Sequence, residues 1–131
     1  NRDPELRENV IFTGFVDDED MIPLMKRASA FAYVSLYEGF GIPVVEAMAA
    51  GVPTVTSNRS SMKEIAEGYG FLADPDNAQS ISDQLQAAVN TSKDDERIKN
   101  AQEHARIYNW KSCAEGTVKS FCEACDRRTS L

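Results

Sequence analysis

Short apolar runs alternate with amphipathic stretches along the first part of the chain. Four of these runs have the length and composition of buried strands, and they cover residues 10–15, 30–34, 52–56 and 69–73. Apolar residues recur at helical spacing between the runs, for example within residues 21–28. Strands that alternate with helices form parallel sheets covered by crossover helices. The pattern therefore predicts a Rossmann-like α/β fold with a three-layer sandwich of helices and sheet.

Local signals place several of the helices. The helix after the second strand is predicted at residues 43–50, because Pro43 suits a helix start and Gly51 suits the position just beyond a helix end. Capping-box patterns at residues 61–64 and 112–115 predict two further helix starts. Three helices are predicted in the last part of the chain, at residues 76–90, 94–108 and 112–126.

Length and composition are those of one globular domain. The 131 residues are enough for a single core, so residues 1–131 are expected to form one unit without a membrane span. Acidic residues outnumber basic ones by 21 to 14, which gives a net charge of −7. This balance repels phosphate backbones, and the basic residues form no stripe. Nucleic acid is therefore not an expected partner.

The cysteines, Cys113, Cys122 and Cys125, all lie near the end of the chain. An odd number of cysteines without a secretory signal fits a reducing cytoplasm better than a disulfide framework. Cys122 and Cys125 have the spacing of a redox or zinc pair, but a metal needs about four ligands, and His104 lies on another segment. Both sulfurs share a helical apolar stripe with Phe121, so we expect inert core thiols and no metal site.

The loop after the second predicted strand holds the strongest candidate site. In an open parallel sheet, ligands bind beyond the carboxyl ends of the strands. Gly39 and Gly41 in this loop let a ligand approach the backbone without side chains in the way. The loop leads into a helix start, where amides and the helix dipole favour an anion. Because Pro43 has no N–H, a phosphate is expected at the amides around Val44 and Val45.

Two carboxylates, Glu38 and Glu46, lie eight residues apart on either side of this helix start. They can flank an anion if each accepts hydrogen bonds from hydroxyl groups, one from a ribose and the other from a hexose. Simpler roles remain open, because a glutamate in a first helical turn stabilises the helix dipole and glycines are common in loops. The loop is not a dinucleotide-binding motif, since Val44 stands where a third glycine is required.

Residues 38–53, EGFGIPVVEAMAAGVP, closely resemble the two-glutamate motif of the retaining glycosyltransferase family 4, the group 1 glycosyltransferases of GT-B fold. Similar positions continue on both sides, at residues 13–16, 56–64, 70–75 and 109–110. The resemblance covers residues 10–110. It implies part of the C-terminal, donor-binding domain of such an enzyme, with extra C-terminal helices over about residues 94–126.

The resemblance also implies an activity. Enzymes of this family move a hexose from a nucleotide-diphosphate sugar, here UDP- or GDP-linked, to an acceptor such as a glycan or lipid, as in polysaccharide biosynthesis. They retain the anomeric configuration and need neither a metal nor another cofactor. A cytoplasmic protein is therefore expected, with the cytoplasmic face of the membrane as a further expected location of the full-length enzyme.

Site residues follow from the resemblance position by position. Glu38 is implied to be the catalytic residue beside the donor sugar. Glu46 is implied to hold the ribose, and the phosphates would sit over Val44 and Val45. The remaining donor-binding positions are implied to be Gly39, Phe40 and Gly41 beside the sugar, Gly14, Phe15 and Val16 beside the base, and Ile42.

The sequence also departs from the family pattern. The family has two more βα units before the strand at residues 10–15, with an arginine and a lysine that neutralise the pyrophosphate, and an acceptor-binding lobe before them. None of these is in the 131 residues, so we expect the chain alone to bind donors weakly and to be inactive. The strand at residues 10–15 is then expected to close onto residues 30–34 or to pair with another molecule, which favours self-association.

Other classes of protein remain open. A sugar-nucleotide epimerase or a non-catalytic nucleotide-sugar-binding module would share the phosphate site, and only the fate of the donor separates them from a transferase. A phospho-receiver domain fits less well. Asp17 and Asp18 would match its acidic pair, although they are more simply a helix start. Ser35 and Asp74, however, stand near the places of its essential aspartate and lysine.

Overall fold

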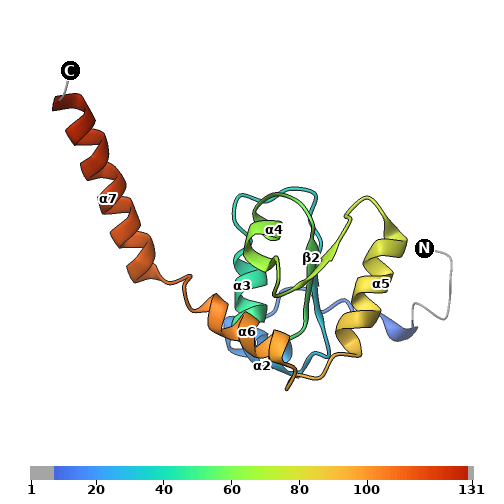
Figure 1. The fold of residues 1–131 in the computed structure, drawn as a ribbon. Helices are drawn as coiled ribbons and strands as arrows, with labels where there is room; N and C mark the ends of the chain where they lie inside the picture. Colours follow the sequence, from blue (N-terminus) through green and yellow to red (C-terminus); the bar gives the residue numbers. More distant parts are fainter. Residues whose placement is uncertain (1–7, 130–131) are drawn as a thin grey trace.

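The computed structural model describes residues 8–129. Within this part of the chain, strands and helices alternate from α2 to α5, and α6 and α7 follow (Figure 1). The helices are α2 (Asp18–Arg27), α3 (Ile42–Ala49), α4 (Ser60–Ala66), α5 (Ala78–Val89), α6 (Glu96–Ala105) and α7 (Trp110–Thr129). The strands are β1 (Phe31–Tyr33), β2 (Thr54–Ser57) and β3 (Phe71–Ala73). The last three predicted strands are confirmed, and the predicted helices are found within a few residues of their expected bounds.

The strands form a parallel sheet in the order β1-β2-β3. Phe31 is in register with Thr54, and Val55 is in register with Phe71. Every residue of the middle strand β2 is buried, because α3 and α4 cover one face of the sheet and α5 covers the other (Figure 1). The three-layer α/β arrangement predicted from the alternation of elements is confirmed.

Apolar layers on both faces of the sheet hold the helices in place. On one face, Val44 and Met48 of α3 are fully buried against Met62 of α4. On the other face, Val55 of β2 packs in a cluster that includes Ile98 of α6. Full burial of one such side chain contributes about 1.5–3 kcal/mol. The packing fixes α3 against the sheet, and so fixes the end of the loop that leads from β1 into α3.

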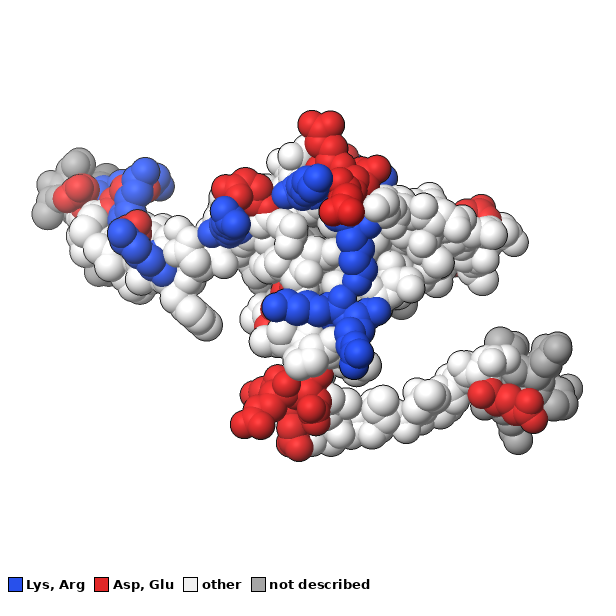
Figure 2. Space-filling view, turned by 90° about the horizontal axis from the view of Figure 1, so that it is seen from below, with Lys and Arg blue, Asp and Glu red and all other residues white. Residues whose placement is uncertain are grey.

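Residues 10–15, predicted to be the first strand, are not part of the sheet. The exposed fractions of their large side chains include 85% at Ile11, 94% at Phe12 and 90% at Phe15. Figure 2 shows an uncharged arm that stands off from the body before the acidic start of α2. The prediction of a strand was wrong, because an apolar run becomes a strand only where a neighbour shares its backbone hydrogen bonds. The expected self-association stays a prediction.

The predicted capping boxes do not cap their helices. Helix α4 begins at Ser60, so Ser61 lies inside the helix, and no side chain caps its start. Helix α7 begins at Trp110, where Asn109 accepts a 2.9 Å hydrogen bond from the amide of Ser112. In both places the pattern identifies a helix but not the residue that begins it. The reason is that Ser61 and Asn109 take partners that a four-residue pattern does not include.

Helix α7 projects away from the body (Figure 1). The described side chains of the helix are exposed, including those of Val118 and Phe121 on its apolar stripe. Cys113, Cys122 and Cys125 are exposed as well, so the prediction of core thiols was wrong. A stripe marks a buried face only where another element covers it. No described helix is long and apolar enough to cross a membrane.

Candidate functional site

The carboxyl ends of the strands lie together at one edge of the sheet, at the top of Figure 1. The loops that follow them are residues 34–41 after β1, 58–59 after β2 and 74–77 after β3. Parallel strands that end together bring loops from distant parts of the sequence side by side. We call residues 34–41 the Glu38 loop, and it forms the centre of the candidate site.

Two hydroxyl groups hold the carboxylate of Glu38. The phenol of Tyr33 donates to Glu38 Oε1 over 2.8 Å, and Ser35 Oγ donates to the same oxygen over 2.9 Å. Because the phenol loses its hydrogen bond to the Glu38 carboxylate when it ionises, that bond raises the pKa of Tyr33. The last residue of β1 and the start of the loop after it thus supply the two partners of the carboxylate.

The backbone of the Glu38 loop is tied to its neighbours at two points. Thr56, which is buried in β2, donates from Oγ1 to the carbonyl of Tyr33 over 2.8 Å. Ser61 of α4 donates from Oγ to the carbonyl of Glu38 over 2.9 Å. One bond fixes the residue before the loop, and the other fixes the residue that carries the carboxylate.

Gly41 caps α3 with a left-handed backbone, at a φ of 108°. Its carbonyl accepts hydrogen bonds from the amides of Val44 at 3.0 Å and Val45 at 3.4 Å. These amides were expected to be free for a phosphate, but the helix itself uses them. Among the residues just before the first turn of α3, the amides of residues 39–42 donate to no acceptor within the part of the chain that the structure describes. A phosphate near this helix start stays a prediction, with the loop amides as its nearest available donors.

Glu46 is exposed, and it is the fifth residue of α3. It was expected in the first helical turn, but the helix begins at Ile42, so Glu46 lies in the second turn and the first turn has no acidic residue. The helix dipole acts mainly within the first turn. The simpler role that was left open, stabilisation of the helix dipole, therefore does not account for Glu46. Its role in holding a ribose stays a prediction.

An aromatic group joins the Glu38 loop to the segment before α7. Phe40 contacts Tyr108 edge-on, with ring centroids 5.5 Å apart. Tyr108 contacts His104 edge-on in turn, and His104 stacks on Tyr69 at 4.0 Å. Burial, assisted by the nearby Glu64, raises the pKa of the Tyr108 phenol. Edge-to-face pairs contribute about 0.5–1.5 kcal/mol each, so this group steadies the outer part of the loop.

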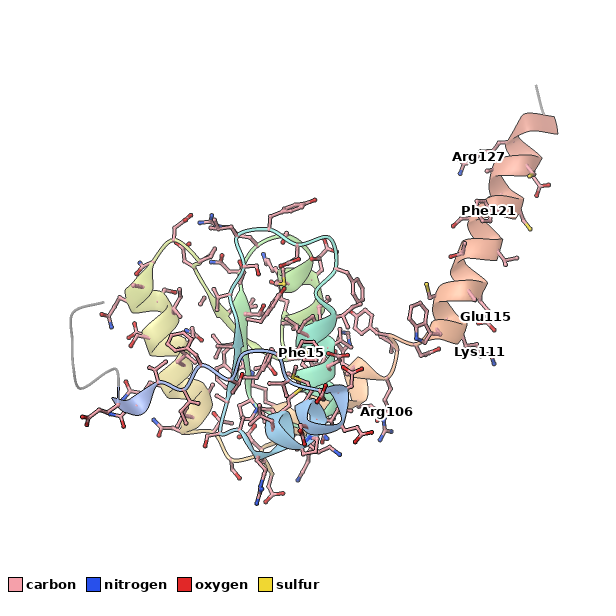
Figure 3. All side chains as sticks on the ribbon, turned by 180° about the vertical axis from the view of Figure 1, so that it is seen from behind. Phe15, Arg106, Lys111, Glu115, Phe121 and Arg127 are labelled. Carbon is pink, nitrogen blue, oxygen red and sulfur yellow. The ribbon has the colours of Figure 1, made fainter. Side chains whose placement is uncertain are left out.

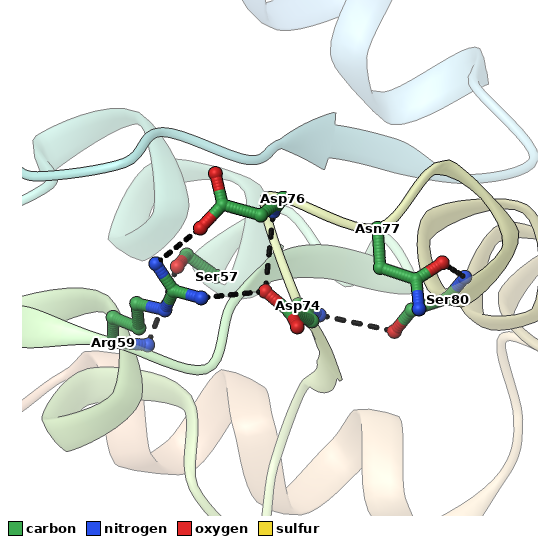
Figure 4. A network of polar contacts seen from close by, with 6 residues as sticks. All are labelled: Ser57, Arg59, Asp74, Asp76, Asn77 and Ser80. Carbon is green, nitrogen blue, oxygen red and sulfur yellow. Dashed lines mark hydrogen bonds and ion pairs between the residues drawn. The ribbon is translucent and has the colours of Figure 1, made fainter.

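Arg59 connects the loops after β2 and β3 (Figure 4). Its guanidinium pairs with Asp74 and Asp76, both at 2.7 Å. Hydrogen bonding to Asp76, the largest cause, raises the pKa of Arg59. The amide of Asp74 donates to Ser80 Oγ at 3.0 Å, which ties the network to α5. Because its charge is already balanced by two carboxylates, Arg59 serves to hold the loops together rather than to offer an unpaired cation.

The residues expected to face the nucleotide base lie on the exposed arm. Gly14 and Phe15 are exposed, and Val16 is partly exposed. Figure 3 shows Phe15 on this arm, and 90% of its surface is accessible. The structure brings together the predicted residues of the Glu38 loop, which are contiguous, but it does not pack the arm against them. Contact of residues 14–16 with a base stays a prediction.

Sequence reasoning did not identify the partners of Glu38. Tyr33 and Ser35 are two residues apart, and in an extended chain this spacing points both side chains to the same side. The spacing could therefore have indicated that their hydroxyl groups act on one partner. Thr56 and Ser61 each bond to a residue 23 positions away, and no local pattern indicates such a contact.

Comparisons with known proteins show which family has this fold and this glycine-rich loop. The family model described as "Glycosyl transferases group 1" matches residues 2–105. The chain belongs to this family. The resemblance seen in the sequence is thereby confirmed, and transfer of a sugar is the activity common to the family.

The similar proteins include several mannosyltransferases. The O-antigen chain mannosyltransferase B of Escherichia coli is 36% identical over 111 residues, which are 84% of this chain and 29% of that protein. The serotype-specific mannosyltransferase WbdA of Escherichia coli is 31% identical over 116 residues, 88% of this chain and 14% of that protein. The GDP-mannose:cellobiosyl-diphosphopolyprenol alpha-mannosyltransferase of Xanthomonas oryzae pv. oryzae is 32% identical over 123 residues, 91% and 32% of the two chains. The chain thus spans less than a third of these relatives.

Proposed function

We propose that this chain is the donor-binding part of a retaining, metal-independent glycosyltransferase that moves mannose from GDP-mannose to a glycan or lipid acceptor. The observation that carries the proposal is the carboxylate of Glu38, held by two hydroxyl groups beside the backbone amides of a helix start. A fixed carboxylate accepts hydrogen bonds from sugar hydroxyls, and main-chain amides donate hydrogen bonds to a diphosphate. The names of the similar proteins support mannose as the sugar, and one of them supports GDP as its carrier.

Each part of the site has a proposed role. Glu38 contacts the donor sugar and stabilises the positive charge that develops at the anomeric carbon. The amides of residues 39–42 face the sugar and the diphosphate, and Glu46 binds the ribose. In the transfer step, the bond between the anomeric carbon and the diphosphate oxygen breaks, and a bond to an acceptor hydroxyl forms on the same face of the sugar. GDP leaves and takes up the proton that the acceptor hydroxyl gives up, and the configuration of the anomeric carbon is kept.

The acceptor is proposed to bind elsewhere in a longer protein that contains this chain. The similar proteins are much longer than the 131 residues, because the 111 and 116 residues that align cover only 29% of one and 14% of another. The chain alone is therefore expected to be inactive. A cytoplasmic location is part of the proposal.

The test is to incubate the full-length native protein with GDP-mannose and a lipid-linked glycan acceptor, with UDP-glucose as the comparison donor. We expect GDP to be released together with a mannosylated product whose anomeric configuration, read by NMR, is that of the donor. A metal chelator should leave the rate unchanged. Conversion of the donor to an epimer without release of GDP would support an epimerase instead, and donor binding without any turnover would support a binding module.

A further inference from the structure

The two oxygens of the Glu38 carboxylate have different surroundings. Oε1 accepts both hydroxyl hydrogen bonds, from Tyr33 and from Ser35. A carboxylate oxygen offers about two lone-pair sites, so Oε1 is saturated by the protein itself. Within residues 8–127, Oε2 accepts no hydrogen bond. Oε2 is therefore the oxygen that remains for a ligand.

The Tyr33 hydroxyl is presented from a fixed position. Tyr33 is the last residue of β1, in register with Thr56 of β2, and the Thr56 hydroxyl binds its carbonyl. Its ring lies nearly parallel to that of Phe31, with an interplanar angle of 8°. A tyrosine side chain has only two torsion angles to lose, so a fixed backbone leaves its hydroxyl little freedom. The phenol thus provides a rigid donor for Oε1.

The backbone of Glu38 is fixed independently, through the hydrogen bond from Ser61 to its carbonyl. The side chain of a glutamate nevertheless has three rotatable bonds, and in a loop it would sample several rotamers. Holding the backbone alone does not determine where the carboxylate points. The hydroxyl groups of Tyr33 and Ser35 supply the missing restraint, because both act on the same oxygen.

We propose that Tyr33 and Ser35 are positioning residues for the sugar-transfer step, which pin Oε1 of Glu38 so that Oε2 faces the donor sugar. This inference rests on the function proposed above for Glu38. Its physical basis is that a catalytic group must keep its geometry through the reaction, and displacement by about one ångström costs on the order of 100-fold in rate. Neither hydroxyl group touches the substrate, so both act only through Glu38.

The kinetic test uses the full-length native protein with GDP-mannose. We expect Tyr33→Phe and Ser35→Ala each to lower kcat about tenfold, and the double variant to lower it about 100-fold. The affinity for GDP alone, measured by calorimetry, should stay within about twofold of the wild-type value, since GDP lacks the mannose that Glu38 is proposed to contact. Ser82→Ala is the matched control, because Ser82 is an exposed serine on α5, outside the Glu38 loop, and should keep normal turnover.

A second measurement requires no turnover. With tyrosine labelled at Cζ, the Tyr33 signal can be assigned in ¹³C NMR spectra by its loss in Tyr33→Phe. The Glu38 carboxylate raises the pKa of Tyr33, so this signal should titrate above the ordinary tyrosine value of about 10. In Glu38→Gln the negative charge is absent, and the midpoint should move down towards that value.

The outcomes separate this inference from the proposed function. If Glu38→Gln loses turnover while the double variant stays within about twofold of wild type, the positioning role is overturned and the proposed function stands. A GDP affinity that falls in step with kcat would also overturn it, because the hydroxyl groups would then serve the fold and not the sugar step. Normal turnover in Glu38→Gln would contradict the proposed function itself. An unchanged Tyr33 titration in Glu38→Gln would contradict the contact on which the inference depends.

Discussion

At Gly41 the chain turns from the Glu38 loop into α3 with a φ of 108°, a conformation that side chains with a Cβ rarely adopt. A Cβ at this position would lie 3.0 Å from the sulfur of Met62, in the buried layer between α3 and α4. Gly39, two residues earlier, has nothing within 4 Å of the same added atom. The sequence suggested one role for both glycines, namely ligand approach. The structure separates them, because Gly41 is required by the backbone and Gly39 leaves open space.

The substitution Gly41→Ala should therefore destabilise the 131-residue chain by about 1–3 kcal/mol, from the strained backbone and the contact with Met62. Urea denaturation followed by circular dichroism measures the change in the free energy of unfolding. Gly39→Ala serves as the control and should change this free energy by less than about 0.5 kcal/mol. Equal effects of the two substitutions would show that the turn at Gly41 does not have the geometry described.

At the scale of whole elements, α3 was the most predictable helix. Proline and glycine mark its two ends, and it is found at Ile42–Ala49 against a prediction of residues 43–50. The strands β2 and β3 were also predictable, because each is a short, mostly buried run that lies beside another strand and under a helix. The strand at residues 10–15 was not, since nothing in an apolar run says whether a partner strand is present. Strand pairing depends on two segments, whereas an apolar pattern describes only one of them.

The side-chain cap at the start of helix α5 should stabilise the folded chain by a measurable amount. The side chain of Asn77 accepts hydrogen bonds from the amides of Gln79 and Ser80, at 3.0 Å and 3.1 Å. Asn77→Ala should lower the free energy of unfolding by about 1 kcal/mol, because two amides at the helix start lose their acceptor. The control is Asn58→Ala, an exposed asparagine for which a smaller change is expected. A thermal melt in which both variants match the wild type would argue against this cap.

The candidate site was predictable only in part, because a sequence pattern shows one contiguous segment but not the segments that contact it. Its centre, the Glu38 loop, is a contiguous stretch between a strand end and a helix start, and the motif at residues 38–53 contains its second half, from Glu38 to Gly41. The contacts that hold it in place come from β2 and α4, through Thr56 and Ser61. Those partners are brought in by the parallel sheet. They became visible only once the strands were placed next to one another.

For the molecule as a whole, the body and its two extensions differ in how much of their surface is buried. The body contains the sheet and the buried layers, whereas the arm at residues 10–15 and helix α7 are exposed (Figures 1 and 2). Exposed apolar side chains on both extensions, such as Phe12 and Phe121, contribute little to the stability of the body. We infer that the free energy of unfolding of the chain resides in residues 18–105, which contain α2 to α6.

Deletion of residues 110–131 tests this division. The shortened chain should unfold within about 2 °C of the full 131-residue chain, because the exposed helix buries almost no surface against the body. Its helical signal in circular dichroism should fall, since α7 is removed. A melting temperature lowered by 5 °C or more, roughly the effect of 1 kcal/mol in a domain of this size, would mean that α7 packs on the body.

The most direct measurement of the central claim is the rate of mannose transfer from saturating GDP-mannose by the full-length native protein carrying Glu38→Gln. This change keeps the size of the side chain but removes the charge that is proposed to act on the donor sugar. We expect kcat to fall at least about 100-fold, with GDP affinity and melting temperature unchanged. A rate within about twofold of the wild-type protein would contradict the assignment of Glu38 and, with it, the function proposed for this site.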